Sequence, residues 1–371
     1  MAPSYTWHPG ADGIAPRWSI PQRLLRDELI SSWLVRVALA HGCNPNTLTE
    51  VLWPGSRAWT HDLDRGFVSE RLTVLSHASG ITENALQAAT LAPVAGLVSP
   101  SRKGSGIWPW VLVLGCRNRL HAGGLQCCPS CFVQGIPYYR IQWRLAWHTA
   151  CPLHHTLLID RCSKCLTSLQ PGLLQPGDWL PQCHACKVSL TAGQPDQEMV
   201  NALAFQSHVD HLVAHLGHYG DVPICLAEWL HVARALLSLV RAASHQKSHV
   251  LMDFCGSFGV EASALRPTSL GLPFEYLSTA ERARLLAAVW SIMRVGPERF
   301  VAEARRVALP SSALSFSPGT APNCLVELAS SLNHRCRHQR SNGKTHHHRT
   351  PQAVLQCWLR LQRRVRRNGL A

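Results

Sequence analysis

The sequence CCPSC at residues 127–131 opens the stretch that decides the fold. Three further two-ligand turns follow it, namely CPLHH at 151–155, CSKC at 162–165 and CHAC at 183–186. Each turn places two cysteines, or a cysteine and a histidine, two residues apart. A tetrahedral structural zinc takes four such sulfur or nitrogen ligands, and one C-x-x-C turn supplies two of them. Paired in chain order, the four turns predict two zinc sites.

The predicted ligands are Cys128, Cys131, Cys151 and His154 for the first site, and Cys162, Cys165, Cys183 and Cys186 for the second. Cys127 could replace Cys128, but only Cys128 leaves the usual two-residue gap to Cys131. Disulfides or buried thiols are the alternative. Disulfides suit secreted domains, whereas this chain shows no export signal, and the spacers are too polar for a thiol core. Because the protein supplies all four ligands of each site, both zinc ions are expected to be structural.

The run from 127 to 165 resembles the zinc module of the TniQ family, the target-selection proteins of heteromeric transposons. The likeness includes the aromatic segment PYYRIQWRLAW at 137–147 and the C-P-x-H turn, which are more specific than C-x-x-C spacing. It extends to PQRLLRDELISSWLVRVA at 21–38, which resembles the opening helix of the family. From about residue 195 onward the resemblance ends.

The resemblance implies a non-catalytic adaptor in DNA transposition. Such an adaptor links a target-recognition element to the AAA+ transposition ATPase and the transposase. In some members that element is a DNA site; in others it is a CRISPR RNA-guided effector complex, on which the family protein rides as a dimer. The implied partners are therefore the AAA+ ATPase and target DNA, with the RNA-guided effector and a homodimer left open.

The composition is that of a globular protein, with 46% hydrophobic residues and 13 tryptophans among 371 residues. No apolar run approaches the ~20 residues that a membrane helix needs. We therefore expect a cytoplasmic, nucleoid-associated bacterial protein whose fifteen cysteines stay reduced, with about half of them on zinc.

The net charge of +14 is concentrated in two places. Residues 116–190 contain seven basic and two acidic side chains, and residues 328–371 contain ten basic and none that is acidic. Clustered positive charge is the footprint of nucleic-acid binding, although a basic tail can also serve solubility alone. The predicted nucleic-acid contacts are Arg140, Arg144, Lys164, Arg363, Arg364, Arg366 and Arg367. The aromatic residues around Arg140 and Arg144 can equally form the core of the zinc module.

We predict a mainly α fold in five parts. These are an N-terminal arm with a helix-turn-helix-like unit (1–98), a linker (99–126), a tandem zinc-ribbon or zinc-finger module (127–192), a C-terminal helical domain (196–330) and a basic tail (331–371). Apolar spacing predicts helices over 27–41, 45–52, 68–78, 82–91, 199–216, 222–244 and 280–295. The last of these follows a capping box formed by Ser278 and Glu281.

The first two helical pairs align on Gly42 and Gly80, and a third copy of the pattern surrounds Gly259. A turn glycine at this place is typical of helix-turn-helix packing. The second helix of each N-terminal pair contains no lysine or arginine, so we expect these units to bind protein rather than to read bases. We predict Trp7 and Trp18 as contacts to the ATPase; they can also cover the neighbouring domain.

The sequence argues against an enzyme. It contains no H-E-x-x-H motif, no phosphate-binding loop and no H-x-E before a C-x-x-C turn, and its 22 carboxylates show no cluster. His208, His211, His215 and His218 recur at helical spacing but have no clustered cysteine or acid beside them. The alternative to the adaptor is a stand-alone, sequence-specific DNA-binding transcription regulator with zinc-finger and helix-turn-helix elements.

Overall fold

The computed structural model describes residues 17–98, 106–114, 124–191, 200–246, 248–262, 264–269, 272–314 and 321–332, together with Trp358 and Gln362. The chain divides into two compact units, Met1–Asn333 and His334–Ala371. Several predicted features lie outside the described residues: Trp7, most of the linker, and the tail arginines Arg363, Arg364, Arg366 and Arg367.

The N-terminal part is helical, as predicted. Its elements are α1 (Ile30–Ala40), α2 (Pro45–Leu52), η1 (Ala58–Thr60), η2 (Leu63–Arg65), α3 (Ser69–Ser79), α4 (Glu83–Ala88) and α5 (Ala92–Val98). The helix ends follow local signals. The Asn44 side chain accepts a hydrogen bond from the Thr47 N–H at the start of α2, and Thr82 does the same for Ala85 at the start of α4. The first helix begins three residues later than expected, and α5 has no counterpart among the predicted helices.

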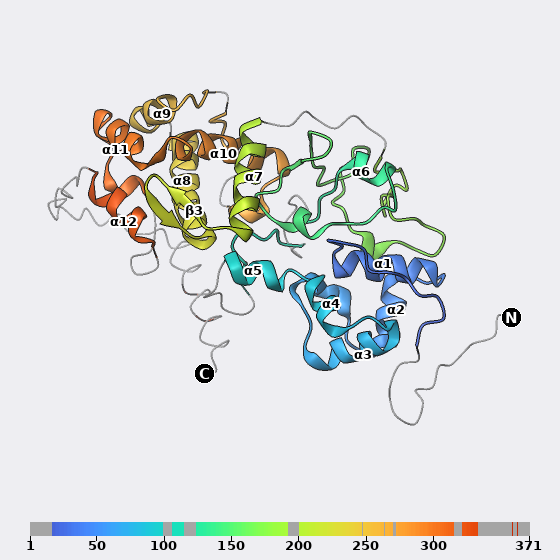
Figure 1. Ribbon diagram of the computed structural model, residues 1–371. Helices are drawn as coiled ribbons and strands as arrows, with labels where there is room; N and C mark the ends of the chain where they lie inside the picture. Colours follow the sequence, from blue (N-terminus) through green and yellow to red (C-terminus); the bar gives the residue numbers. More distant parts are fainter. Residues whose placement is uncertain are drawn as a thin grey trace. The chain divides into compact units, whose positions relative to one another are not determined.

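The two helical pairs share the turn that the sequence repeat predicts. Gly42 and Gly80 both adopt the left-handed conformation, with φ of 68° and 73°. Helix α1 packs against α2, and α3 packs against α4 (Figure 1). Trp33, Leu75 and Leu86 are fully buried in the shared core of these helices. This packing fits a helix-turn-helix unit and also an ordinary helical hairpin, so the helix-turn-helix assignment stays a prediction.

The central part of the chain has little regular structure. It contains α6 (Pro129–Val133), η3 (Ile141–Arg144), β1 (Ala150–Cys151), β2 (Thr156–Leu157) and η4 (Pro171–Leu173). Strands β1 and β2 pair antiparallel, with Cys151 opposite Thr156. The segment 106–114, part of the predicted linker, forms no helix or strand, but it buries Trp110 and Val111, and Val111 bridges Leu145. We call residues 124–191 the metal module.

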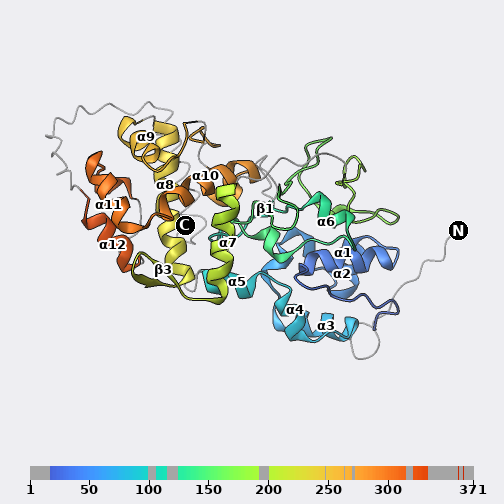
Figure 2. The same cartoon turned by 45° about the horizontal axis from the view of Figure 1, so that its top comes forward.

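The C-terminal part is a second group of helices with one small hairpin. Its elements are α7 (Val200–Ala214), β3 (Gly217–Tyr219), β4 (Val222–Ile224), α8 (Leu226–Gln246), α9 (His249–Gly256), η5 (Phe274–Tyr276), α10 (Thr279–Met293), α11 (Gly296–Arg306), η6 (Ser311–Ala313) and α12 (Asn323–Ser330). Helix α10 packs against α7 and α8 (Figure 2). Both hydrogen bonds of the predicted capping box at Ser278 and Glu281 are present.

Two predictions for this part are wrong. The helix expected over 222–244 begins only at Leu226, because residues 222–224 pair with β3 in an antiparallel hairpin. The third helix-turn-helix is absent: α9 and the turn at Gly259 form, but residues 260–262 and 264–269 contain no helix.

The metal module is seated on the N-terminal helices through η4. This turn packs against α1 and α2. Gly172 in η4 faces the Trp59 ring so closely that an added Cβ would lie 2.5 Å from Trp59 Cε3. Only a residue without a side chain fits this contact.

We expect Gly172→Ala to lower the free energy of unfolding by about 1–3 kcal/mol, because the methyl group must push η4 away from Trp59. Urea unfolding monitored by tryptophan fluorescence measures this change. Gly135→Ala is the matched control, since its Cβ would meet nothing within 4 Å. Equal effects of the two substitutions would contradict the proposed contact.

Candidate metal centres

The eight predicted ligands converge into two separate groups of four. The first group is Cys128, Cys131, Cys151 and His154, and the second is Cys162, Cys165, Cys183 and Cys186. Within each group the ligand atoms all lie within 4.8 Å of one another. Each group can therefore hold one metal ion, as the order of the turns along the chain predicts.

The spacing of the ligand atoms fits a tetrahedral ion. In the first group His154 Nδ1 lies 3.4 Å from Cys128 Sγ and 3.3 Å from Cys151 Sγ, and Cys131 Sγ lies 3.6 Å from Cys151 Sγ. In the second group the Cys162–Cys186 and Cys165–Cys183 sulfur pairs are both 3.6 Å apart. A tetrahedron with metal–sulfur bonds of ~2.3 Å has sulfur–sulfur edges of about 3.8 Å. The donor set of three thiols and an imidazole, or of four thiols, is one that zinc takes.

Three of the four ligand turns share one backbone shape. The residue after the second ligand is His155, Leu166 or Lys187, and each has a φ between 51° and 60°. Its N–H donates to the carbonyl of the first ligand of that turn, at 2.9 to 3.0 Å. This conformation is unusual for residues other than glycine, and it brings both ligand side chains to the same side of the turn. The first turn differs, because Cys131 lies in the short helix α6.

The two turns of the second group repeat each other. Arg161 bridges Ser168 around the first turn, and Gln182 bridges Ser189 around the second. In both turns the N–H of the first cysteine donates to the carbonyl five residues later, at 2.9 Å. This near-symmetric pair of turns is the arrangement expected of a zinc ribbon.

Cys127 is not part of either group. Its backbone pairs with Ile159 in both directions, at 3.0 and 2.9 Å, and its thiol is fully buried. Burial raises the pKa of this thiol well above its ordinary value. By contrast, hydrogen bonds from the thiols of Cys131 and Cys151 lower the pKa of Cys128. Cys128 Sγ lies 3.4 Å from His154 Nδ1 within the first group, so Cys128 and not Cys127 is the candidate ligand.

Arg144 does not contact nucleic acid, because its side chain is completely buried. Its guanidinium donates to Asp64 at 2.7 Å, to Asp62 at 2.6 Å and to the Leu112 carbonyl at 2.9 Å. The prediction for this residue is therefore wrong. Its two carboxylate partners lie at the start of η2, 80 and 82 residues earlier in the chain. The closely spaced acids of H-D-L-D-R at 61–65 were the signal that could have indicated them.

The other predicted contacts of the metal module are placed differently. The Arg140 guanidinium lies over the rings of Tyr138 and Trp143, 4.8 and 5.7 Å from their centroids, and is half-buried. Lys164 is exposed within the first turn of the second group. Both remain predictions. The rings of Tyr139, Trp143 and Trp147 are buried, so the core role of these aromatics is the correct interpretation.

Trp18 covers the N-terminal helices. Its ring lies 5.5 Å from the Trp33 ring, and its backbone N–H donates to the Ala78 carbonyl at 2.8 Å. Trp33 itself is fully buried. Part of the Trp18 side chain stays accessible, so a contact to a partner remains a prediction.

The four histidines at helical spacing are spread over different environments. His208 lies 5.0 Å from the Trp229 ring and 5.3 Å from the Trp290 ring, where burial lowers its pKa. His211 stacks on His215 at 4.3 Å. In the part of the chain that the structure describes, none of the four histidines belongs to a group of three or more side chains that could hold a metal ion.

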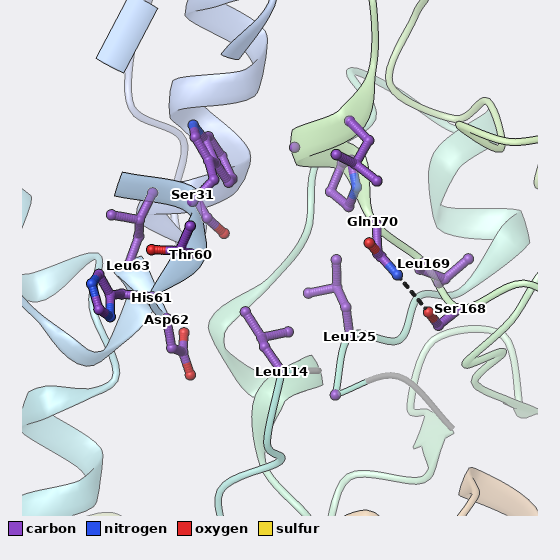
Figure 3. A pocket seen from close by; sticks show the side chains of 15 residues that line it. Ser31, Thr60, His61, Asp62, Leu63, Leu114, Leu125, Ser168, Leu169 and Gln170 are labelled. Atoms are coloured by element: carbon purple, nitrogen blue, oxygen red, sulfur yellow. Dashed lines mark hydrogen bonds between the residues drawn. The ribbon is translucent and has the colours of Figure 1, made fainter. Parts of the chain in front are cut away.

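A cavity of about 470 Å³ lies where η1 and η2 face the spacer of the second metal group (Figure 3). Ser31, His61 and Asp62 line one side, and Leu125 and Leu169 line the other. Both Ser31 and Asp62 are already engaged in the hydrogen bonds around Arg144. Sequence reasoning did not indicate this cavity. Among the described helices, none is long and apolar enough to cross a membrane.

We expect Cys131→Ser and Cys183→Ser each to cost the protein one bound metal ion, because each removes one of four ligands. The rest of the module should become less stable, since structural zinc contributes ~10–16 kcal/mol of apparent binding energy in small fingers. Plasma emission spectroscopy gives the metal content, and Cys127→Ser is the control that should keep both ions. A metal content well below two per chain in freshly purified wild-type protein would contradict both sites.

The buried Asp64 carboxyl predicts an unusual dependence of stability on pH. Burial raises its pKa to about 6, against the opposing charge of Arg144. Between pH 4 and 6 the folded state then binds more protons than the unfolded state, so this group makes stability fall as pH rises. Relative to Asp64→Asn, the wild type should gain about 1 kcal/mol on going from pH 7 to pH 5.

Urea unfolding of both proteins at each pH measures this difference, and the contribution of the metal sites cancels in it because both proteins contain them. A difference that does not change with pH would show that Asp64 stays ionised throughout.

Comparison with known proteins gives one family. Residues 20–158 match the model of the TniQ family, and no curated protein matches the chain. The matched range begins just before α1 and ends at β2, so it contains the N-terminal helices and the first metal group, while the second group lies beyond it. The resemblance seen in the aromatic segment and the opening helix is thereby confirmed. We call residues 20–158 the TniQ region, because this is the range that the family model matches.

Proposed function

We propose that this protein is a non-catalytic adaptor for target-site selection in DNA transposition. It would link a target-recognition element to the AAA+ transposition ATPase and the transposase. The observation that carries the proposal is the TniQ match, which spans the N-terminal helices and the first metal group as one continuous region. Target DNA, an RNA-guided effector complex and a second copy of the chain are partners that the family role allows.

We further propose that both metal groups hold zinc and that both ions are structural. Each group has four protein ligands, and seven of the eight are cysteines, whose soft sulfur a tetrahedral zinc ion accepts readily, with His154 completing the first set. A closed set of four leaves no position for water or substrate. The chemistry of transposition would then belong to the partners.

The N-terminal helices are the proposed surface for the ATPase. Residues 1–115 carry nine basic and eight acidic side chains, so this part has almost no net charge to attract DNA. A groove of about 480 Å³ runs along α2, lined among others by Asn46, Glu50, Val51 and Arg57. Protein interfaces are enriched in tryptophan, which fits the arm that carries Trp7 and Trp18.

DNA contact is proposed for the metal module and the tail. Lys164 and Arg140 are the predicted contacts of the module that keep exposed surface. The tail contributes ten basic side chains over residues 328–371. Neutralisation of phosphates by such residues is independent of sequence and weakens steeply with salt. Base-specific recognition would therefore come from a partner rather than from this chain.

Capture experiments with the full-length protein test the adaptor role. The immobilised wild-type chain should retain the ATPase encoded with it. Trp7→Ala and Trp18→Ala should abolish this retention while metal content and DNA affinity stay unchanged, because the arm contributes to the protein interface only. Trp179→Ala is the matched control, since Trp179 is 51% exposed but lies in the metal module.

Thermal unfolding of Trp18→Ala must accompany the capture, because Trp18 also packs on Trp33. Retention of the ATPase with loss of DNA binding in both variants would reverse the assignment of the two surfaces. If the wild-type chain does not retain the ATPase but binds one DNA duplex sequence by itself, the result would support the alternative function, a stand-alone transcription regulator.

A further inference from the structure

The five residues before the ligand Cys151 are all held by helices from the C-terminal part of the chain. Residues 146–150 belong to the TniQ region, whereas α7 and α10 lie outside it. The contacts are hydrogen bonds from three side chains, Gln206 and Asp210 of α7 and Arg282 of α10. This arrangement is independent of the proposed adaptor role.

Gln206 replaces the strand partner that β1 lacks on one side. Its Oε1 accepts from the N–H of Thr149 at 3.1 Å and of Ala150 at 3.3 Å, and its Nε2 donates to the Ala150 carbonyl at 3.2 Å. The Gln206 side chain is buried, so no water competes for these bonds. Ala150 directly precedes the ligand Cys151, and the amide therefore fixes the backbone from which that thiol projects.

Arg282 holds the same segment from the other helix. Its Nη1 donates to the Ala146 carbonyl at 2.7 Å, and its Nη2 donates to Gln126 Oε1 at 2.8 Å. Gln126 in turn donates to the His148 carbonyl at 2.6 Å. Gln126 lies two residues before the ligand Cys128, so one arginine connects the approaches to both ligand turns of the first group.

Arg282 is a buried cation with an unusual set of partners. Burial lowers its pKa to about 10, and among the described residues it forms no ion pair with a carboxylate. Its acceptors are carbonyl and hydroxyl oxygens, including the Leu277 carbonyl at 3.2 Å. A buried charge that is costly to desolvate is retained here for the bonds it makes to the metal module.

Asp210 is the third side chain that holds residues 146–150, and it is half-exposed. One of its oxygens accepts from Trp147 Nε1 at 2.9 Å and lies 2.8 Å from His148 Nε2. We propose that Gln206, Asp210 and Arg282 are positioning residues for the first metal group, so that the C-terminal helices set how tightly that group retains its ion. Residues that orient metal ligands without touching the ion typically change metal affinity 10–100-fold when they are replaced.

The test uses full-length protein loaded with cobalt(II), because a site of three thiolates and one imidazole and a site of four thiolates absorb differently. Gln206→Met keeps the length of the side chain but removes its hydrogen bonds. We expect a chelator to withdraw cobalt from the first group about tenfold faster, or more, with the second group unchanged in the same molecule. Asn201→Leu is the matched control, since this amide also lies on α7 but, among the described residues, donates to Ser291 of α10 and to no part of the metal module.

Asp210→Ala keeps the experiment decisive if Gln206→Met fails to fold, because a side chain that is 42% exposed can be shortened without opening a cavity. It should accelerate release from the first group in the same direction. Release at the wild-type rate from the first group in these variants would overturn the proposal. Equal acceleration at both groups, or acceleration in Asn201→Leu as well, would also overturn it, since either result indicates general loss of stability.

Discussion

Buried backbone N–H and C=O groups need hydrogen-bond partners, and the metal module has almost no helix or strand to supply them. Between residues 124 and 191 the longest helix is the five-residue α6, and each strand has two residues. Two substitutes satisfy the backbone instead. The ligand turns close on themselves, with the N–H after the second ligand donating to the carbonyl of the first. Side chains from other parts of the chain, above all Gln206 and Arg282, reach in and pair with the segments between the turns. The closed turns and the side chains of Gln206 and Arg282 thus supply the hydrogen bonds that helices and strands supply elsewhere in the chain.

The same requirement changes how the positive charge of the module should be interpreted. Arg144 and Arg282 are both fully buried, and they meet different partners. Arg144 pairs with Asp62 and Asp64 and so joins η3 to η2, whereas Arg282 is surrounded by carbonyl and hydroxyl oxygens. Only Arg144 belongs to the metal module, and its burial means that the sequence count of basic residues overstates the positive charge on the surface of the module. Lys164, by contrast, is exposed.

The features that the sequence predicted correctly depend on residues that are close together in the chain. The spacing within C-x-x-C and C-x-x-H turns identified all eight side chains of the two groups that could hold a metal ion, because each turn is completed within five residues. Caps at Asn44, Thr82 and Ser278 marked three helix starts for the same reason. The failures concern partners far apart in the chain. The carboxylates that bury Arg144 precede it by 80 and 82 residues, and Gln206 lies more than 50 residues after the strand it completes. The hairpin at 217–224 was missed since its apolar residues merge with those of α8.

The TniQ match ends at residue 158, but the folded body does not end there. Residues 146–150 lie inside the match, and without α7 the N–H groups of Thr149 and Ala150 would lose their Gln206 partner, at about 1–3 kcal/mol for each group left unsatisfied. The C-terminal part therefore has an inner face that is constrained, because Gln206, Asp210 and Arg282 must reach the approach to Cys151. Its outer helices, α9, α11 and α12, make none of these contacts among the described residues. Sequence change on that outer side leaves the hydrogen bonds of Gln206, Asp210 and Arg282 in place, whereas change on the inner face removes them.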